Sequence, residues 1–208
     1  RVFGHKNGVK AVRDTVEAAA EIGIKFLTLY AFSTENWSRP KSEVNALMRL
    51  LISAIKKETQ NLMSNNIKLD TIGETNNLPQ KAKKELSEAI ENTKKNTRMT
   101  LILALSYSGR WDILNATKKL IEDGVATENI DEKLFQQYLA TESVPEPELL
   151  IRTSGEYRIS NFLLWQSAYS ELYFTDTLWP DFRKTNLTDA IIDYQKRERR
   201  FGKTKEQI

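Results

Sequence analysis

The segment Met99 to Leu105 (MTLILAL) constrains the fold of this chain more than any other. It is almost continuously apolar, whereas a strand with one solvated face alternates apolar and polar residues. This pattern is typical of a parallel strand that is covered on both faces. Parallel strands are joined by crossover connections, which are usually helices. The rest of the chain should therefore alternate between strands and helices.

The remaining sequence has this alternation. Further strands are predicted over 24–32, 67–72, 149–151 and 171–174. Amphipathic or capped helices are predicted over 9–22, 40–63, 81–95, 111–122, 131–140 and 187–199. The pattern predicts an α/β fold with a mainly parallel sheet. No repeat, low-complexity segment or long linker interrupts it, and 208 residues fit one domain, so we expect a single domain over 1–208.

Composition excludes several classes of protein. The chain contains no Cys, which rules out disulfides and thiolate metal sites and favours the cytoplasm. No apolar run reaches the roughly eighteen residues that suggest a membrane-spanning helix. The net charge is +3, and no basic run with interleaved aromatic residues is present. We therefore expect no nucleic-acid partner.

Four polar loops follow the predicted strands, and ligands of open α/β sheets bind beyond the carboxyl ends of strands. The loops are STENWSR (33–39), GETNN (73–77), SYSGRW (106–111) and RTSGEYRIS (152–160). Three of them combine Arg with hydroxyl residues, and two add Gly. Arg, Ser, Thr and close backbone N–H groups are suited to phosphate oxygens. The set favours a phosphate or diphosphate pocket, although surface loops also contain these residues without binding anything.

Two further residues stand out by their context. His5 is the only histidine, and a lone histidine usually has no catalytic role, so its pattern alone leaves it undecided. Glu171 lies in an apolar stretch near Tyr169 and Tyr173. A carboxylate in such surroundings needs a partner, and a metal ion is one candidate.

Several long motifs in order resemble the signature blocks of cis-prenyltransferases, most closely the bacterial undecaprenyl diphosphate synthase type. They are RVFGHKNG (1–8), LYAFSTENWSRP (29–40), SYSGRWDI (106–113), IRTSGEYRISNFLLWQSAYSELYFTDTLWPDF (151–182) and RERRFG (197–202). The resemblance implies a central, mostly parallel β-sheet surrounded by helices, assembled as a homodimer. It also implies repeated condensation of isopentenyl diphosphate onto farnesyl diphosphate with cis geometry and with Mg²⁺.

The resemblance assigns roles to residues of this sequence. Arg1 and His5 would contact the allylic diphosphate, and Glu171 would be a magnesium ligand. The loop that orders both substrates would consist of Ser33, Thr34, Glu35, Asn36, Trp37 and Arg39. The diphosphate of isopentenyl diphosphate would be held by Arg152, Arg158, Ile159 and Ser160. Asn36 is the proton acceptor suggested for the family, but a neutral amide is a very weak base, which favours an orienting role.

The sequence departs from the family pattern at its start. The family's first block, a strand ending in an Asp-Gly-Asn-Gly-Arg-Trp loop that supplies a metal-binding Asp, is not found. We therefore expect an N-terminally incomplete domain that lacks one strand and half of the metal site. Ser154 stands where many bacterial members have Gly, and a hydroxyl there is compatible with the loop.

The main alternative is a non-catalytic partner subunit with the same fold. Such relatives lose the phosphate-binding side chains, whereas Arg39, Arg152, Arg158 and Ser160 are all present here. A generic nucleotide-binding protein is a weaker alternative, because neither a G-x-x-x-x-G-K nor a G-x-G-x-x-G motif occurs. An enzyme is the favoured interpretation.

Association and product handling can also be predicted. Apolar and aromatic residues are dense over 168–182, which favours a symmetric homodimer through this region. A long polyprenyl product needs an apolar channel, which the helix over 44–63 could line against the strand that begins at Met99, unless the core is fully packed there. The product must be delivered to the membrane, so the expected location is the cytoplasm, with peripheral association at the inner membrane face left open.

Overall fold

The structure, a computed structural model, describes residues 2–199, and of residues 2–6 it describes the backbone alone. The chain divides into two units. One comprises 16–145 and 161–164, and the other comprises 1–15, 146–160 and 165–208. Helix α1 (Val2–Ile22) begins in the second unit and ends in the first.

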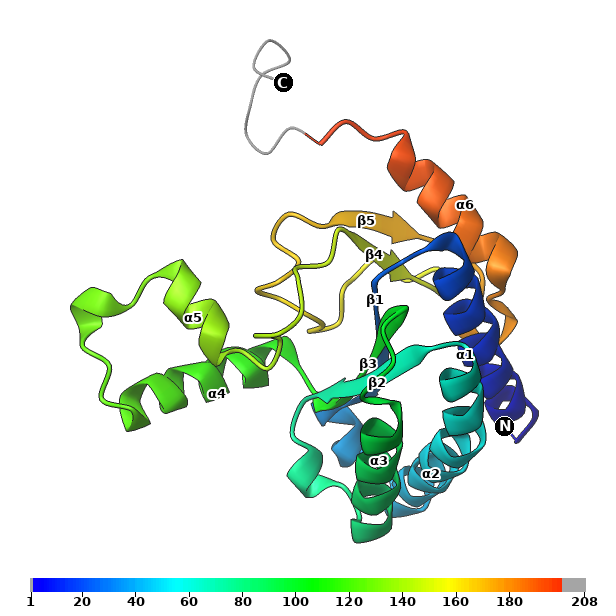
Figure 1. The fold of residues 1–208 in the computed structure, drawn as a ribbon, viewed down its shortest axis with the longest axis horizontal. Helices are drawn as coiled ribbons and strands as arrows, with labels where there is room; N and C mark the ends of the chain where they lie inside the picture. Colours follow the sequence, from blue (N-terminus) through cyan, green and yellow to red (C-terminus); the bar gives the residue numbers. More distant parts are fainter. Residues whose placement is uncertain (1, 200–208) are drawn as a thin grey trace. The chain divides into compact units, whose positions relative to one another are not determined.

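The first unit contains a three-stranded parallel sheet in the order β1–β3–β2 (Figure 1). Its strands are β1 (Phe26–Ser33), β2 (Ile67–Ile72) and β3 (Met99–Tyr107). Every residue of β3 except Thr100 is buried. The prediction that the apolar run forms a parallel strand covered on both faces is therefore confirmed.

Helices α2 (Lys41–Ser64) and α3 (Gln80–Thr93) pack against each other and against β2 (Figure 1). Each follows a proline, Pro40 or Pro79, whose fixed φ suits the entry to a helix. Their buried faces have the expected apolar period, and α2 buries Val44, Met48, Ile55 and Leu62. The crossover from strand to helix to strand carries the chain back to the same end of the sheet each time.

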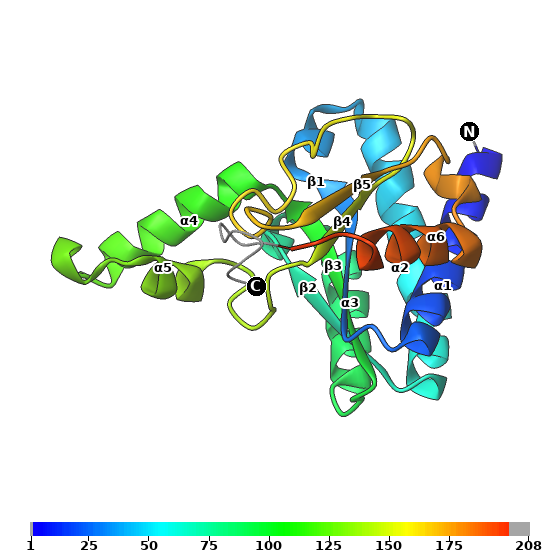
Figure 2. The ribbon, with the colours of Figure 1, turned by 90° about the horizontal axis from the view of Figure 1, so that it is seen from above.

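Helices α4 (Gly109–Glu122) and α5 (Glu132–Tyr138) pack against each other and extend away from the three-stranded sheet in both views (Figures 1 and 2). The Ser108 hydroxyl caps α4 by accepting from Trp111 N, and Asp131 Oδ1 caps α5 by accepting from Leu134 N. These side chains satisfy N–H groups that a helix cannot pair internally.

The second unit contains a two-stranded parallel sheet of β4 (Leu149–Arg152) and β5 (Glu171–Phe174). Leu149 is paired with Glu171, and Arg152 with Phe174. Helix α6 (Lys184–Gln195) follows, and Arg183, the residue before it, forms an ion pair with Asp14 of α1 at 3.2 Å.

The predicted fold class is confirmed, because parallel sheets flanked by helices are present. Among the described residues the strands form two sheets rather than one. The helix predicted over 187–199 begins earlier and ends at Gln195, since the arginines beyond it turn to contact the β4–β5 sheet. No helix in the described part of the chain is long and apolar enough to cross a membrane. The single domain over 1–208 stays a prediction.

Candidate functional site

Three of the four predicted loops meet at the carboxyl edge of the β1–β3–β2 sheet. Trp37 Nε1 donates to Ser106 Oγ at 2.9 Å, and Glu74 N donates to the Ser106 carbonyl at 3.2 Å. Gly73 allows the loop over 73–77 to pass close to the end of β3. Its φ is +111°, and a Cβ there would lie 2.2 Å from the Leu105 carbonyl oxygen. Buried Ser106 therefore joins the loops over 33–39, 73–77 and 106–111.

The loop over 33–39 forms a 3-10 helix (Thr34–Ser38) that is stabilised mainly by its own side chains. Asn36 Oδ1 accepts from Ser33 N at 3.0 Å, and the Ser38 hydroxyl donates to the Glu35 carbonyl at 2.7 Å. Arg39 lies at the end of the loop and pairs with Glu43 of α2 at 2.9 Å. The amide oxygen of Asn36 is thus occupied by a backbone donor.

Asn161 links this loop to the start of α4. Its Nδ2 donates to Glu35 Oε1 at 2.7 Å, its Oδ1 accepts from Arg110 N at 2.9 Å, and its carbonyl accepts from Gly109 N at 2.7 Å. Gly109 has no room for a side chain, because a Cβ would lie 2.5 Å from Leu164 Cγ. The close approach of 161–164 to α4 therefore requires glycine at this position.

Glu35 has a lowered pKa. Desolvation alone raises the pKa of this carboxyl group, but hydrogen bonds, led by the one from Asn161, outweigh it and bring the pKa below its usual 4.5. The carboxylate is therefore ionised at neutral pH and accepts from Asn161 and from the Thr34 hydroxyl.

A buried aromatic cluster lies beneath the three loops. Tyr107, which is fully buried, donates from its hydroxyl to Asp112 Oδ2 at 2.9 Å, and Asp112 Oδ1 accepts from Ala140 N at 2.8 Å. Tyr30 stacks on Phe162 with ring centroids 4.4 Å apart and donates to the Tyr107 carbonyl. Burial, together with the negative charge of Glu35, raises the pKa of Tyr30 to about 12. Tyr30 is therefore a neutral support of the site.

Trp111 is more than a core aromatic. Its ring packs edge-on against Tyr107, and its Nε1 donates to Glu74 Oε2 at 3.0 Å. This contact ties the loop over 73–77 to α4.

The fourth loop, 152–160, belongs to the β4–β5 unit. It is held against the chain that follows β5 by two backbone bonds, from Ser154 N to the Thr177 carbonyl and from Gly155 N to the Thr175 carbonyl. Arg152 Nε is buried, and no described group accepts its hydrogen bond. A buried donor without an acceptor is costly, so this nitrogen is suited to an anionic ligand.

The other predicted residues of this loop lie closer to solvent. Arg158 is exposed and pairs with Glu156, Ser160 is exposed with φ of 50°, and Ile159 is half-buried. Exposed guanidinium and hydroxyl groups remain accessible to a ligand that enters from solvent. Whether they converge on one anion with Arg152 stays a prediction.

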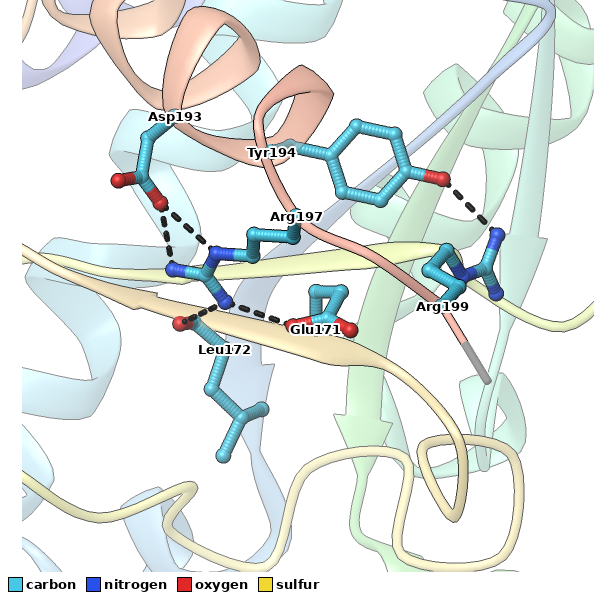
Figure 3. A network of polar contacts seen from close by, with 6 residues as sticks. All are labelled: Glu171, Leu172, Asp193, Tyr194, Arg197 and Arg199. Carbon is cyan, nitrogen blue, oxygen red and sulfur yellow. Dashed lines mark hydrogen bonds and ion pairs between the residues drawn. The ribbon is translucent and has the colours of Figure 1, made fainter. Parts of the chain in front are cut away.

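Glu171 begins β5, and its partner is a cation from the same chain (Figure 3). Arg197 Nη1 donates to Glu171 Oε2 at 2.8 Å. The predicted need for a partner is met in this way. In the part of the chain that the structure describes, no three His, Cys, Asp or Glu side chains are grouped to hold a metal ion. These residues alone therefore do not fit a metal centre, and the role of Glu171 as a ligand stays a prediction.

Two predicted residues lie at the chain start. Arg1 falls outside the described residues, and His5 lies in α1 with its side chain outside what the structure describes. Sequence reasoning did not single out Asn161, Glu74 or Asp112. Their position inside or beside the motifs was the only available signal, because each acts through partners distant in sequence.

Comparison with known proteins decides the family. A family model described as putative undecaprenyl diphosphate synthase matches residues 1–202. The chain belongs to this family. An isoprenyl transferase of Chlorobaculum tepidum is 55% identical over 100% of this chain and 80% of its own length. A ditrans,polycis-undecaprenyl-diphosphate synthase, (2E,6E)-farnesyl-diphosphate specific, of Pasteurella multocida is 52% identical over 99% of this chain and 88% of its own length.

Solved structures of the undecaprenyl diphosphate synthase family agree with this assignment. A probable undecaprenyl diphosphate synthase of Campylobacter jejuni has a TM-score of 0.86 and 35% identity, and covers 95% of this chain and 93% of its own. Lavandulyl diphosphate synthase of Lavandula x intermedia, solved with dimethylallyl diphosphate, has a TM-score of 0.92 and 38% identity, and covers 96% and 88%. The predicted family and the prediction of a cis-prenyltransferase enzyme are confirmed, and nothing favours the non-catalytic partner.

Proposed function

We propose that this cis-prenyltransferase condenses isopentenyl diphosphate repeatedly onto farnesyl diphosphate and makes undecaprenyl diphosphate. In each step the allylic carbon–oxygen bond breaks and diphosphate leaves. The double bond of isopentenyl diphosphate attacks the allylic carbon, and one proton is lost to form the new cis double bond. Support comes from the Pasteurella multocida relative and from a Haemophilus influenzae relative 50% identical over 98% of this chain, both named as farnesyl-diphosphate specific.

The observation that carries this proposal is the buried Nε of Arg152, whose N–H has no hydrogen-bond acceptor among the described groups. Arg152 stands at the end of a parallel strand, where the sheet's loops are open to ligands. A diphosphate oxygen would supply the missing acceptor, and Arg158, Ser160 and the backbone at Ile159 would hold the remaining oxygens of isopentenyl diphosphate. Arg158 now pairs with the carboxylate of Glu156. When the substrate binds, its diphosphate would replace this carboxylate as the anion that Arg158 contacts.

The loop over 33–39 is proposed to order the two substrates. Asn36 Oδ1 already accepts from Ser33 N, which leaves its Nδ2 to donate toward a substrate oxygen. Trp37 fixes the loop to Ser106, and Arg39 offers a charged fork at the loop's end. Arg1 and His5 are proposed to contact the allylic diphosphate on the basis of their motif alone.

Prenyltransferases of this family generally need a divalent metal ion. Our proposal for that ion is Mg²⁺, which binds proteins through one or two carboxylates together with substrate phosphates. Within residues 2–199 the motif offers Glu171, whose carboxylate is bound by Arg197. A metal ion at Glu171 would compete with Arg197 for this carboxylate.

A homodimer is proposed because large apolar side chains are exposed in the region predicted for association. Tyr169, Leu172 and Leu178 are 68%, 37% and 55% exposed. Helix α4 exposes Leu114 and Ile121, at 61% and 74%. Apolar surfaces of this kind mark sites of association. Light scattering at micromolar concentration tests the proposal, and a monomeric mass would contradict it. The proposed location is the cytoplasm, with the product delivered to the membrane.

The decisive experiment is product sizing with the full protein. Labelled isopentenyl diphosphate and Mg²⁺ are incubated with dimethylallyl, geranyl or farnesyl diphosphate in separate reactions. We expect the highest kcat/KM with farnesyl diphosphate and long products. A short product formed best from dimethylallyl diphosphate would replace the proposal with short-chain synthesis, and no incorporation from any primer would reject it.

A further inference from the structure

Asn161 is the residue at which the chain passes from the β4–β5 unit into the unit of the three-stranded sheet. It directly follows Ser160, the last residue of the loop that is proposed to hold the diphosphate of isopentenyl diphosphate. Both residues have a left-handed backbone conformation, with φ of 50° at Ser160 and 60° at Asn161. This conformation is uncommon for residues other than glycine and persists where surrounding contacts hold it. The contacts of Asn161 therefore help to hold the backbone at this point.

Asn161 is anchored to the beginning of α4 by two hydrogen bonds that it accepts. Its carbonyl accepts from Gly109 N at 2.7 Å, and its Oδ1 accepts from Arg110 N at 2.9 Å. These N–H groups lie in the first turn of the helix, where a helix leaves its N–H groups without internal partners. The bonds fix both the backbone and the side-chain amide of Asn161, so they determine where its Nδ2 points.

The Nδ2 of Asn161 holds the loop that contains Asn36. It donates to Glu35 Oε1 at 2.7 Å, while Trp37, on the other side of Asn36, donates to Ser106 Oγ at 2.9 Å. Asn36 is thus flanked by two anchors. Ser106 is buried, whereas the bond between Asn161 and Glu35 is exposed. An exposed hydrogen bond competes with water, so this second anchor is the one that substrate binding can strengthen.

We infer that Asn161 is a positioning residue that couples diphosphate binding at 158–160 to the ordering of the loop over 33–39. The inference rests on the proposed function, which assigns the diphosphate to the first segment and the ordering of both substrates to the second. A bound diphosphate restricts the backbone of Ser160, and the peptide bond to Asn161 passes this restriction on to the amide that holds Glu35. By linkage, an ordered loop in turn tightens diphosphate binding.

The bond between Asn161 and Glu35 can be broken and restored by substitutions that barely change side-chain size. Asn161→Asp keeps the acceptor for Arg110 N but places a second carboxylate against Glu35, and like charges repel. The double variant Glu35→Gln/Asn161→Asp restores the bond with donor and acceptor exchanged. Glu35→Ala removes the bond while both bonds of Asn161 to α4 stay in place, so it keeps the test valid if Asn161→Asp fails to fold.

Asn66 offers a matched control at the opposite end of the strands. Its φ is 57°, and its carbonyl accepts from Arg98 N at 2.9 Å. Its Oδ1 accepts from Thr97 N at 2.9 Å, and its Nδ2 donates to Thr97 Oγ1 at 3.2 Å. It precedes β2, so it lies at the amino edge of the sheet, away from the loops of the site. Asn66→Ala therefore reports the purely structural cost of losing such a set of bonds.

The experiment measures amide hydrogen exchange of the full protein with and without inorganic diphosphate, and diphosphate affinity by calorimetry. In wild type, saturating diphosphate should slow exchange at 33–39 about fivefold or more, a typical coupling between two sites. Asn161→Asp and Glu35→Ala should lose this protection, and Glu35→Gln/Asn161→Asp should recover most of it. Asn66→Ala should be less stable than wild type but keep the protection. Arg158→Ala should need about tenfold more diphosphate for the same protection, because the ligand acts at 158–160.

Steady-state kinetics provides a second readout. Asn161→Asp should lower kcat as well as raise the KM for isopentenyl diphosphate, and the double variant should recover both. Unchanged protection in Asn161→Asp and Glu35→Ala, equal loss in Asn66→Ala, or no recovery in the double variant would overturn the inference. So would wild type that neither binds diphosphate nor gains protection from it. Failure of the proposed function alone is distinguishable, since wild type would then make no long product while 33–39 still responded to diphosphate.

Discussion

Tyr107 and Tyr138 allow a matched test of how burial sets the strength of a tyrosine–carboxylate hydrogen bond. Tyr107 donates to Asp112 in the core at 2.9 Å, and Tyr138 donates to Asp123 at the surface at the same distance. Tyr107 and Asp112 are 0% and 1% exposed, whereas the second pair is exposed. Asp112 and Asp123 lie in the first turn and at the C-cap of the same helix, α4. Substitution of each tyrosine by Phe removes only the hydroxyl group.

The expected effects differ several-fold. A buried hydrogen bond to a carboxylate contributes roughly 1.5–3 kcal/mol, and 1 kcal/mol shifts the Tm of a chain of this size by about 2–4 °C. Tyr107→Phe should therefore lower the Tm by about 3–12 °C. The exposed pair is screened by solvent and contributes far less, so Tyr138→Phe should lower the Tm by no more than about 2 °C.

Differential scanning calorimetry of the full protein at neutral pH measures both values, with near-ultraviolet circular dichroism to check that the native packing is kept. Equal shifts for the two variants would refute the reasoning. A decrease in the Tm of less than about 1 °C for Tyr107→Phe would also refute it, because the expected decrease is about 3 °C or more. Either outcome would mean that burial does not strengthen the bond to Asp112.

Three other predictions concern the site. Arg158→Ala should raise the KM for isopentenyl diphosphate about tenfold or more with kcat little changed, because it loses a charge-assisted hydrogen bond; a kcat effect alone would contradict this. The lowered pKa of Glu35 contributes stability that is present above pH 4.5 and is lost as the pH falls through the lowered value. Asn161→Ala removes the main hydrogen bond that lowers this pKa, so it should destabilise the protein more at neutral than at acidic pH. An equal loss of stability at both pH values would contradict this prediction. Met99→Trp should shorten the products if the channel ends there, with Met99→Leu as the volume-matched control; an unchanged product distribution would move the channel elsewhere.

Local patterns predicted the secondary structure well because local physics determines it. Strand β2 occupies the predicted residues, and α2 begins at Lys41, one residue after the predicted start at Pro40. The error in the last helix is different in kind. Its pattern continued to 199, but side chains of the β4–β5 unit compete for Arg197 and Arg199, and a helical period contains no information about such distant carboxylates.

The same limit applies to the candidate site. Parallel strand direction predicted that all four loops share one sheet edge. Three of them do, as the bond from Trp37 to Ser106 shows, but the loop over 152–160 follows β4 of a second sheet. The role of Asn161 could not be predicted, because its bond to Glu35 joins residues 126 apart in sequence. Glu171 was recognised as a carboxylate that needs a partner, yet the apolar residues around it in the sequence could not show whether that partner is a metal ion or a guanidinium.

The contacts of the loop over 33–39 also bear on where the proton goes in the proposed condensation. Asn36 is a weak base as an amide, and its oxygen already accepts from Ser33 N. Glu35 is the carboxylate of this loop, but hydrogen bonds from Asn161 and Thr34 stabilise its charged form and lower its pKa, which makes it a weaker base. Neither group is therefore favoured over a diphosphate oxygen as the proton acceptor. A diphosphate oxygen of the bound substrate is a stronger base and is present in every turnover, so we infer that the loop orients the substrates while the substrate itself accepts the proton.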